Sequence, residues 1–515
     1  MSYRSYVISP PAQTEPLDAR QVPNNAGGYA YQIDPWKQLT RFLVLGSEGG
    51  TYYVSERKLT KQNATVINTC LVADAKRTID HIVEVSESGR APKNDPAIFA
   101  LAIAASYTDP TVRAYALAGL PKVCRIPTHL FHFCEYLKGQ RGWGRGLRRA
   151  VARWYNENPS LAYHLVKYQS RDGWSNRDVL RKAHPSPVGD LQQALFKYVA
   201  KSEWTSLPAI VDGFEQAKTA EIGTLIKLIR EVGLTREMLP TEALKHPQIW
   251  EALLVKMPMQ ALVRNLSTMT RVGLLTNLSR ETKEVVSRLQ GIKGSRVHPL
   301  QILNALKTYQ SGRGTSSTWT PVRAVIDALN DAFYAAFGEV TPTNKNLMLA
   351  LDVSGSMGSG QVGGTALTPR EACAALALIT ANVEKSYEMC AFAGTFIPLT
   401  ISPTQRLDDV VRLIDRLDFG STDCALPMIS AQMRRLGIDA FSVFTDSETW
   451  VGRIHPMQAL RSYRMASGID AKLIVVGMTS TGFTIGDPQD PGCLDVVGFD
   501  LATPEILSGF ITGRL

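Results

Sequence analysis

The stretch Asn-Leu-Met-Leu-Ala-Leu-Asp-Val-Ser-Gly-Ser-Met, residues 346 to 357, decides the fold of the second half of this chain. Its apolar part, which ends at Asp352, is short enough for a strand buried on both faces of a parallel sheet. Asp352, Ser354 and Ser356 then alternate along a turn. A carboxylate and two hydroxyls are hard oxygen ligands, and the glycine between them lets the backbone curl around an ion. The sequence therefore predicts a divalent cation site, with Mg²⁺ as the expected ion.

Two later segments can supply further ligands to this site. Asp-Phe-Gly-Ser-Thr-Asp, residues 418 to 423, contributes Thr422, and another apolar run ends in Asp446. Because the carboxyl ends of parallel strands meet at one edge of a sheet, we expect Asp352, Thr422 and Asp446 to lie together. Asp423 would add a carboxylate that alters the affinity or the anionic partner accepted. The alternative is that these residues only cap turns.

The order Asp-x-Ser-x-Ser, followed by Thr422 and Asp446, resembles the metal-ion-dependent adhesion site of von Willebrand factor A domains. Alternating predicted strands and helices over residues 342–515 indicate a doubly wound, parallel α/β sheet. Residues 355–364 lack the Lys-Ser/Thr pair of a phosphate-binding loop, and no Gly-x-Ser-x-Gly elbow occurs. A mostly hydroxyl-ligated cation suits capture of a partner's carboxylate or phosphate. We therefore expect a binding protein rather than an enzyme.

Net charge divides the chain into two unlike parts. Residues 345–515 hold 13 Lys and Arg against 18 Asp and Glu, a balance of −5, whereas the whole chain carries +9. The remaining residues therefore carry about +14, which favours a polyanionic partner for the first part. No run of about 18 apolar residues and no hydrophobic signal core occur. With seven irregularly spaced cysteines, this composition predicts a cytoplasmic protein without a membrane partner.

The first part reads as an irregular segment, residues 1–30, followed by helices over residues 31–341. Asp95-Pro96 and Asp109-Pro110 are each expected to open a helix, with the Asp as cap and the Pro in the first turn. Helices of about 10 to 15 residues with short links predict an α-solenoid of paired helices. The repeat is degenerate, so a globular bundle stays open as the alternative.

Residues 138–184 hold 11 Lys and Arg against 3 Asp and Glu. A helix beginning near Arg145 would place four arginines on one face and apolar side chains on the other. Adjacent like charges destabilise a helix by roughly 0.2 to 0.5 kcal/mol per pair, so this row needs an outside benefit, for which phosphates are the expected source. A merely solvated face is the alternative. The expected row comprises Arg145, Arg148, Arg149 and Arg153.

Other nucleic-acid contacts are expected on either side of this row. The candidates are Lys138, Arg141, Lys167, Arg171 and His184. The arginine row suits duplex or folded RNA, whereas Lys167, Arg171 and His184 lie nearer a Gly-Trp loop that suits a single-stranded tail. Trp143 and Trp174 are candidates for base stacking, and Trp154 falls on the apolar face and is expected in the core.

The stretches around Trp143, Trp174, His184, His298-Pro299 and residues 45–55 resemble the TROVE domain of the Ro autoantigen family, including its bacterial members. The resemblance runs through nearly the whole chain and ends in the expected von Willebrand A domain. It implies HEAT-like helical repeats closed into a ring. It also implies that small noncoding Y RNAs bind outside and that single-stranded 3′ ends of misfolded RNAs bind in the central hole. The implied role is RNA quality control or maturation.

The same resemblance assigns residues and partners. Lys167, Arg171 and His184 match positions implicated in RNA contact, whereas Asn176 stands where a His is commoner, which puts one contact in doubt. The implied partners are Y RNA, misfolded RNA and an exoribonuclease tethered through the RNA, and we expect a monomer. The open alternative is a protein-adhesion or assembly module that acts through the metal site.

Overall fold

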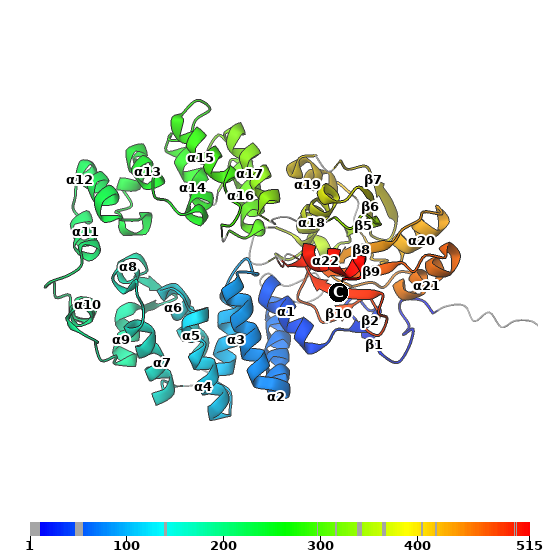
Figure 1. The fold of residues 1–515 in the computed structure, drawn as a ribbon, viewed down its shortest axis with the longest axis horizontal. Helices are drawn as coiled ribbons and strands as arrows, with labels where there is room; N and C mark the ends of the chain where they lie inside the picture. Colours follow the sequence, from blue (N-terminus) through cyan, green and yellow to red (C-terminus); the bar gives the residue numbers. More distant parts are fainter. Residues whose placement is uncertain are drawn as a thin grey trace, which may run out of the picture.

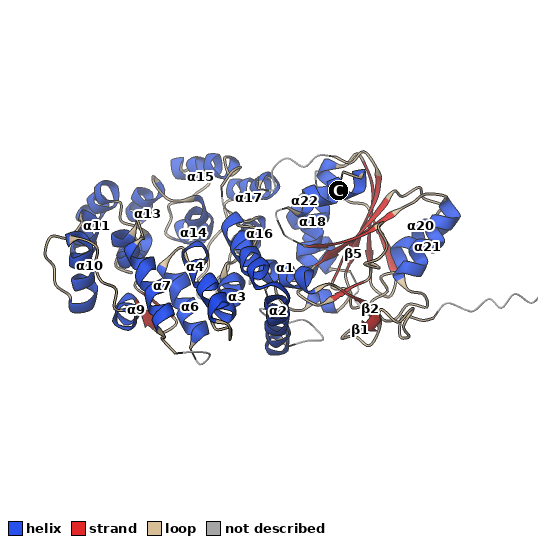
Figure 2. Cartoon of the chain, turned by 60° about the horizontal axis from the view of Figure 1, so that its bottom comes forward, coloured by secondary structure: helices blue, strands red, loops and turns tan. Residues whose placement is uncertain are grey.

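The computed structural model describes residues 11–46, 55–138, 142–295, 297–314, 317–336, 342–362, 367–402, 405–417, 420–498, 500 and 502–514. Helices α1 to α17 form an arc, and both ends of this arc lie beside an α/β domain (Figure 1). The six-stranded sheet is confined to one end of the molecule (Figure 2). The helical part and the sheet part expected from the sequence are therefore present.

The helical arc contains short helices joined by short links, as the proline and glycine pattern predicts. Its longest helix, α2, has non-helical backbone angles at Asp74, where two helical segments meet. A two-stranded hairpin of β3 (Ser170–Arg171) and β4 (Trp174–Ser175) interrupts the series. The helices are α1 (Pro35–Leu45), α2 (Glu56–Ser88), α3 (Asp95–Ala105), α4 (Pro110–Ala118), α5 (Leu120–Val123), α6 (Pro127–Leu137), α7 (Arg145–Asn156), α8 (Leu161–Lys167), α9 (Asn176–Ala183), α10 (Asp190–Lys201), α11 (Ala209–Ala217), α12 (Ile222–Lys227), α13 (Pro247–Leu254), α14 (Met259–Arg271), α15 (Arg280–Gln290), α16 (Pro299–Ser311) and α17 (Arg323–Ala335).

The two Asp-Pro signals have different outcomes. Asp109 caps α4 as predicted, and its side chain accepts a hydrogen bond from the backbone N–H of Thr111. The cap predicted at Asp95 is wrong, because Asp95 is already the first helical residue and Asn94 occupies the capping position. The Asn94 side chain instead bonds Ser86 and the carbonyl of Val123. The side chain at the capping position of α3 therefore makes tertiary contacts and does not cap the helix.

The first and last parts of the helical arc are in direct contact. The Nε2 atom of His298, at the start of α16, lies 3.0 Å from the carbonyl oxygen of Arg90. The Nε2 of Gln301 donates to the carbonyl oxygen of Pro92 at 2.6 Å. Both carbonyls belong to the connection between α2 and α3, so residues about 200 positions apart hold the arc in its curved shape.

The sheet of the α/β domain has the order β11-β9-β8-β5-β6-β7. All neighbouring pairs are parallel except β6 with β7, an antiparallel edge strand that the sequence reading missed. Helices α18 and α22 cover one face, and α20 and α21 cover the other (Figure 2). The elements are β5 (Asn346–Asp352), α18 (Pro369–Val383), β6 (Ser386–Phe392), β7 (Phe396–Leu399), α19 (Leu407–Asp415), α20 (Leu426–Met433), β8 (Ala440–Thr445), α21 (Pro456–Ser467), β9 (Lys472–Gly477), β11 (Cys493–Val497) and α22 (Thr503–Thr512).

Strand β5 lies inside the sheet, between β8 and β6, and it is buried from Leu347 to Asp352. Its side chains alternate between two cores: Leu349 and its neighbours two residues away pack in the core that includes α18, whereas Met348 and Ala350 pack in the core that includes α20 and α21. Burial on both faces explains why the run is almost continuously apolar. It also fixes Asp352 at the carboxyl end of the strand.

The segment expected to be irregular, residues 1–30, contains ordered strands where it is described. Strand β1 (Gln21–Pro23) pairs with β2 (Tyr29–Gln32), and β2 pairs with β10 (Phe483–Thr484). The expectation of irregular structure is therefore wrong for these residues. Strands of two to four residues are too short to leave a sequence pattern, and this sheet needs a partner more than 450 positions away.

Helix α1 is joined to the α/β domain by a buried ion pair. The guanidinium of Arg41 is fully buried and lies 2.6 Å from a carboxylate oxygen of Asp495. Its Nη1 also donates to the carbonyl oxygens of Thr481 and Phe483, at 3.0 and 2.9 Å. A buried charge needs such partners. The domain boundary is expected between residues 341 and 342. Residue 341 lies outside the described residues, and residue 342 lies within them.

Candidate metal centre and nucleic-acid interface

The predicted metal turn lies at the carboxyl end of β5. Asp352, Ser354 and Ser356 are all at most 1% exposed. The backbone N–H of Ser354 donates to Asp352 Oδ1 at 2.9 Å, and the hydroxyl oxygens of Ser354 and Ser356 lie 3.0 Å apart. The turn therefore gathers three side-chain oxygens at the edge of the sheet.

The other two predicted ligands lie in loops that contact this turn. Asp446 follows β8, the parallel neighbour of β5, and the residue before it, Thr445, is hydrogen-bonded to Asp352. The loop that contains Thr422 is held by a bond from the N–H of Gly355 to the carbonyl of Gly420 at 3.1 Å. Thr422 and Asp446 are both fully buried. The fold thus places all five predicted ligands on adjoining segments.

The hydrogen bonding of these oxygens is compatible with a role as cation ligands. Within the part of the chain that the structure describes, Thr422 Oγ1 and Asp446 Oδ2 are buried and have no hydrogen-bond partner. An acceptor left buried in this way costs roughly 1 to 3 kcal/mol, and a bound cation would remove that cost. Burial raises the pKa of both Asp352 and Asp446, and the charge of Asp352 raises that of Asp446 further. A divalent cation would favour both charged forms.

Three residues around the turn have contacts that the sequence did not indicate. Thr445 donates its hydroxyl to Asp352 Oδ2 at 2.5 Å and so orients that carboxylate. Glu448 is fully buried only two residues after Asp446. Asp423 accepts hydrogen bonds from Gln13 and from the N–H of Ala425, at 2.8 and 3.0 Å. These bonds direct its Oδ1 to the N-terminal segment and to the start of α20.

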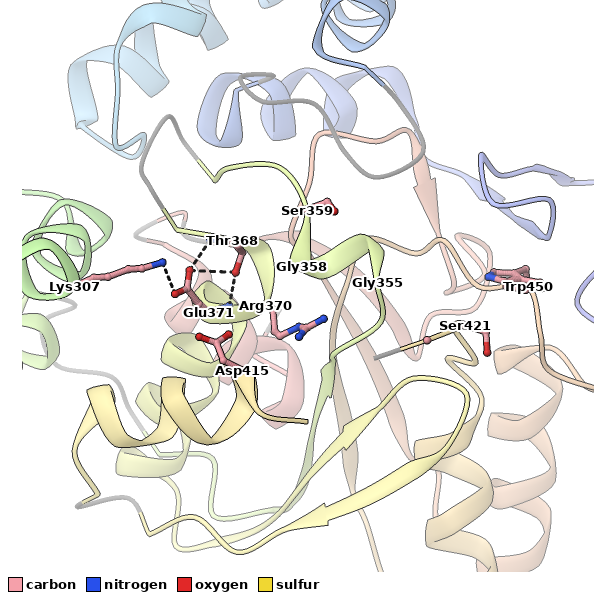
Figure 3. Close-up of a pocket in the computed structure, with 11 residues that line it drawn as sticks. Lys307, Gly355, Gly358, Ser359, Thr368, Arg370, Glu371, Asp415, Ser421 and Trp450 are labelled. Atoms are coloured by element: carbon pink, nitrogen blue, oxygen red, sulfur yellow. Dashed lines mark hydrogen bonds and ion pairs between the residues drawn. The ribbon is translucent and has the colours of Figure 1, made fainter. Parts of the chain in front are cut away.

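A cavity of about 800 Å³ adjoins the metal turn, and Gly355 lies on its wall. Figure 3 shows the Arg370 guanidinium pointing away from Glu371 toward the metal turn, and Nη2 of Arg370 donates to the carbonyl of Ser354 at 3.1 Å. Lys307 of α16 forms an ion pair with Glu371 across the same cavity, so both domains contribute to its walls. Arg370 is nearly buried, and this burial lowers the pKa of its guanidinium.

The arginine row has the two-faced arrangement that the sequence predicts. Helix α7 begins at Arg145, and Val151 and Trp154 on its inner face are buried. The indole N–H of Trp154 donates to the carbonyl of Cys124, which confirms Trp154 as a core residue. Arg153 approaches Glu157 at 4.0 Å. The exposed face presents Arg145, Arg148, Arg149 and Arg153.

The remaining nucleic-acid candidates lie on neighbouring elements. Lys167 ends α8, where its ammonium donates to the Tyr163 hydroxyl at 2.9 Å and lies over the Tyr163 and Tyr168 rings. Arg171 is exposed in the hairpin. His184 is exposed at the end of α9. Lys138 is exposed and lies 3.6 Å from Glu135, whereas Arg141 lies outside the described residues.

Asn176, at the position where the family resemblance implied a His, is only 3% exposed. Its Oδ1 accepts from the Tyr155 hydroxyl at 3.0 Å, and its Nδ2 donates to the carbonyl of Tyr168 at 2.8 Å. In this chain Asn176 therefore links Tyr155 to the backbone of Tyr168, the residue that follows Lys167. The buried amide is not placed to contact a ligand at the surface.

The tryptophans near the basic surface differ in how exposed their rings are. Trp143 and Trp174 are partly buried against each other, with ring centroids 6.0 Å apart, so their faces are only partly open. Trp204, which the sequence reading passed over, is 63% exposed in the connection between α10 and α11. Arg177 of α9 donates to the Val199 carbonyl in α10 and to the Ser202 hydroxyl at the start of this connection, at 2.9 and 3.1 Å. No feature of the sequence around Trp204 distinguishes it from the buried tryptophans.

The fold and the site define a two-domain class: a TROVE domain of helices followed by a von Willebrand A domain. Residues 22–220 and 206–312 match the TROVE domain, and residues 346–511 match the Ro60 vWA domain. The chain therefore belongs to the Ro60 family, as the sequence resemblance indicated. No helix in the described ranges is both long and apolar enough to cross a membrane.

Relatives cover both domains. The chain is 41% identical over 519 residues to the RNA-binding protein RO60 of Deinococcus radiodurans, covering 98% of this chain and 97% of that protein. It is 35% identical over 595 residues to the RNA-binding protein RO60 of Caenorhabditis elegans, covering 98% and 92%. The crystal structure of Deinococcus radiodurans RO (RSR) protein has a TM-score of 0.71 at 39% identity, covering 94% of this chain and 100% of that one.

Proposed function

We propose that this chain is an RNA-binding protein. The single observation that carries the proposal is the arginine row on α7. Its four cations face solvent, while the opposite face of the helix is buried. The names of the relatives in Deinococcus radiodurans and Caenorhabditis elegans support it. The row suits phosphates because it offers many donors in a line and no matching line of acids.

The proposed arrangement is a ring of HEAT-like repeats with two RNA sites. Folded Y-type RNA would bind the outer basic surface, and the single-stranded 3′ end of a misfolded RNA would occupy the central hole. The contacts of His298 with Arg90 and of Gln301 with Pro92 support closure, since they join the first and last repeats. A tail that passes through the hole would then be available to an exoribonuclease for quality control or maturation.

The test removes the arginine row and measures RNA affinity against salt. Replacing Arg145, Arg149 and Arg153 with Gln should weaken binding and reduce the slope of log K against log salt by about 0.7 to 0.9 for each lost phosphate contact. The control replaces Arg434 and Arg435, exposed arginines of the α/β domain, and should leave both quantities unchanged. Equal effects of the two variants, or no RNA binding by the unaltered protein, would refute the proposal.

We infer that the cradle at the end of β5 holds Mg²⁺ through Asp352, Ser354, Ser356, Thr422 and Asp446. The ion would supply an electrophilic centre with an open position for a partner's carboxylate or phosphate. Asp352→Ala should lower cation affinity by more than about 100-fold, because the variant loses a charged direct ligand. Titration calorimetry with Mg²⁺ or Mn²⁺ measures this change. RNA affinity should stay within about 2-fold, since the arginine row lies in the other domain.

A second candidate function is protein adhesion or assembly through this metal site. The cavity between Lys307 and Arg370 favours it, because a partner bound to the cation would have room beside the turn and contacts with both domains. Affinity purification discriminates the two functions. Recovery of proteins that depend on Mg²⁺ and on Asp352, with no small RNA in a nuclease-free preparation, would favour adhesion.

A further inference from the structure

The N-terminal clasp, which we define as residues 12–28, crosses both loops of the metal centre. Gln13 is completely buried at its centre. Its Nε2 donates to Asp423 Oδ1 at 2.8 Å, and its Oε1 accepts the hydroxyl of Thr449. Asp423 follows the proposed ligand Thr422, and Thr449 lies three residues after the proposed ligand Asp446. One amide side chain therefore links the two loops.

A second part of the clasp holds Glu448. The backbone N–H and the side-chain amide of Asn25 donate to the two Glu448 oxygens at 2.8 and 2.7 Å, and the N–H of Ala26 adds a bond at 3.1 Å. Glu448 is fully buried. A buried carboxylate without such donors would be costly, so the loop conformation with Glu448 inside requires the clasp.

The fit between the clasp and the loops is close at the backbone level. A Cβ atom at Gly28 would overlap the carbonyl oxygen of Thr449, and one at Gly452 would overlap the side chains of Gln13 and Asp423. The N–H of Gln13 donates to the carbonyl of Gly452 at 2.9 Å. The two glycines therefore allow the clasp and the loops to approach closely, and the buried amide of Gln13 fills the space between them.

We propose that Gln13 and Asn25 are positioning residues for the metal centre. By holding Asp423 and Thr449 at fixed separation, Gln13 would set the distance between Thr422 and Asp446, and Asn25 would fix the segment after Asp446. This inference rests on the proposed metal site. Groups that orient direct ligands typically change metal affinity by about 10- to 100-fold when they are removed. Linkage requires the reverse effect as well: bound cation must fasten the clasp.

The first experiment compares Gln13→Ala with Arg20→Ala. Arg20 belongs to the same clasp but bonds Asp487, at 2.6 and 2.8 Å, in a segment that carries none of the proposed ligands. Titration calorimetry with Mn²⁺ on the full chain should show an affinity loss of about 10- to 100-fold for Gln13→Ala and of less than about 2-fold for Arg20→Ala. Equal losses in the two variants, or none in either, would overturn the inference.

The second experiment needs no substitution in the clasp, so it remains decisive if Gln13→Ala does not fold. Hydrogen exchange of the amides in residues 12–28 should slow by at least about 5-fold when Mg²⁺ is added to the unaltered chain, and Asp352→Ala should abolish that slowing. If the cation binds but exchange is unchanged at saturating Mg²⁺, the inference about the clasp is overturned and the proposed metal site is not. Absence of any cation binding by the unaltered chain would instead overturn the proposed metal site.

Discussion

The proposed metal cradle at the end of β5 and the arginine row on α7 are built in opposite ways. The cradle is buried, and two of its oxygen atoms, on Thr422 and Asp446, lack partners among the described residues. The row is exposed, and water can satisfy each of its arginines. An unpaired polar atom is expensive only where water is excluded, so a buried site reveals its ligand through an energetic deficit. An exposed site reveals its ligand only through the clustering of like charge.

The largest expected effect tests whether burial sets the cost of an arginine. Arg41→Ala should lower the free energy of unfolding by about 3 to 5 kcal/mol, because it leaves Asp495 buried without its partner. Arg149→Ala, on the exposed row, should change it by less than about 0.5 kcal/mol. Urea denaturation of both variants measures the difference. Similar losses for both arginines would remove the proposed distinction between buried and exposed charge.

The next effect concerns a partly buried histidine of the helical arc, whose protonation can be tested with acid. Burial, aided by the charge of Arg125, lowers the pKa of His129 to about 3. The unfolded chain therefore takes up the proton first as pH falls, so stability is present above pH 6.5 and is lost below it. The loss should reach about 2 kcal/mol between pH 6.5 and 5. Denaturation curves at several pH values should show His129→Gln with a weaker dependence, and an unchanged dependence would exclude His129 as its source.

A smaller effect should divide the basic surface itself. Replacing Lys167 and Arg171 with Ala should weaken binding of RNA with a free 3′ tail by about 10-fold, and binding of blunt, structured RNA by less. The Arg145, Arg149 and Arg153 replacements should show the opposite preference. Fluorescence anisotropy with matched tailed and blunt RNAs measures both. Equal losses on the two RNAs would indicate one undivided electrostatic surface.

The smallest expected effect concerns Trp204. If its exposed ring stacks on a base, Trp204→Ala should weaken single-stranded RNA binding by about 5-fold, the lower end of the range for one stacked base. Trp204→Phe should retain most of the affinity, since a smaller ring still stacks. Leu191→Ala provides the control, because Leu191 is 56% exposed on α10. A loss no greater than that of the control would assign Trp204 no part in binding.

The sequence could predict that the proposed ligands Asp352 and Asp446 lie together, because both positions follow from strand geometry. An apolar run that ends in Asp352 and another that ends at Asp446 define two buried parallel strands, and parallel strands place their ends together. The inner and outer faces of α7 followed from helical periodicity in the same way. Each of these signals lies within about ten neighbouring residues.

The features that sequence reasoning missed depend on contacts between distant segments. Gln13 meets Asp423 across 410 positions, and nothing near Gln13 indicates that partner. Asn94, not Asp95, is the N-cap residue of α3, and its side chain bonds Ser86 and Val123 rather than the first turn of the helix. Asn176 was judged from the residue type found in relatives, whereas its burial follows from Tyr155 and Tyr168. Short strands and single side chains carry too little periodicity to reveal such contacts.

The position of the clasp also has a consequence for the order of events during protein synthesis. Residues 12–28 leave the ribosome well before their partners at residues 423 to 454, which follow about 400 residues later. Protein synthesis proceeds at about 5 to 20 residues per second, so the clasp remains unpaired for roughly 20 to 80 seconds before its binding surface is made. The helical arc can assemble during this interval, whereas the α/β domain is completed only after both ends of the chain are available.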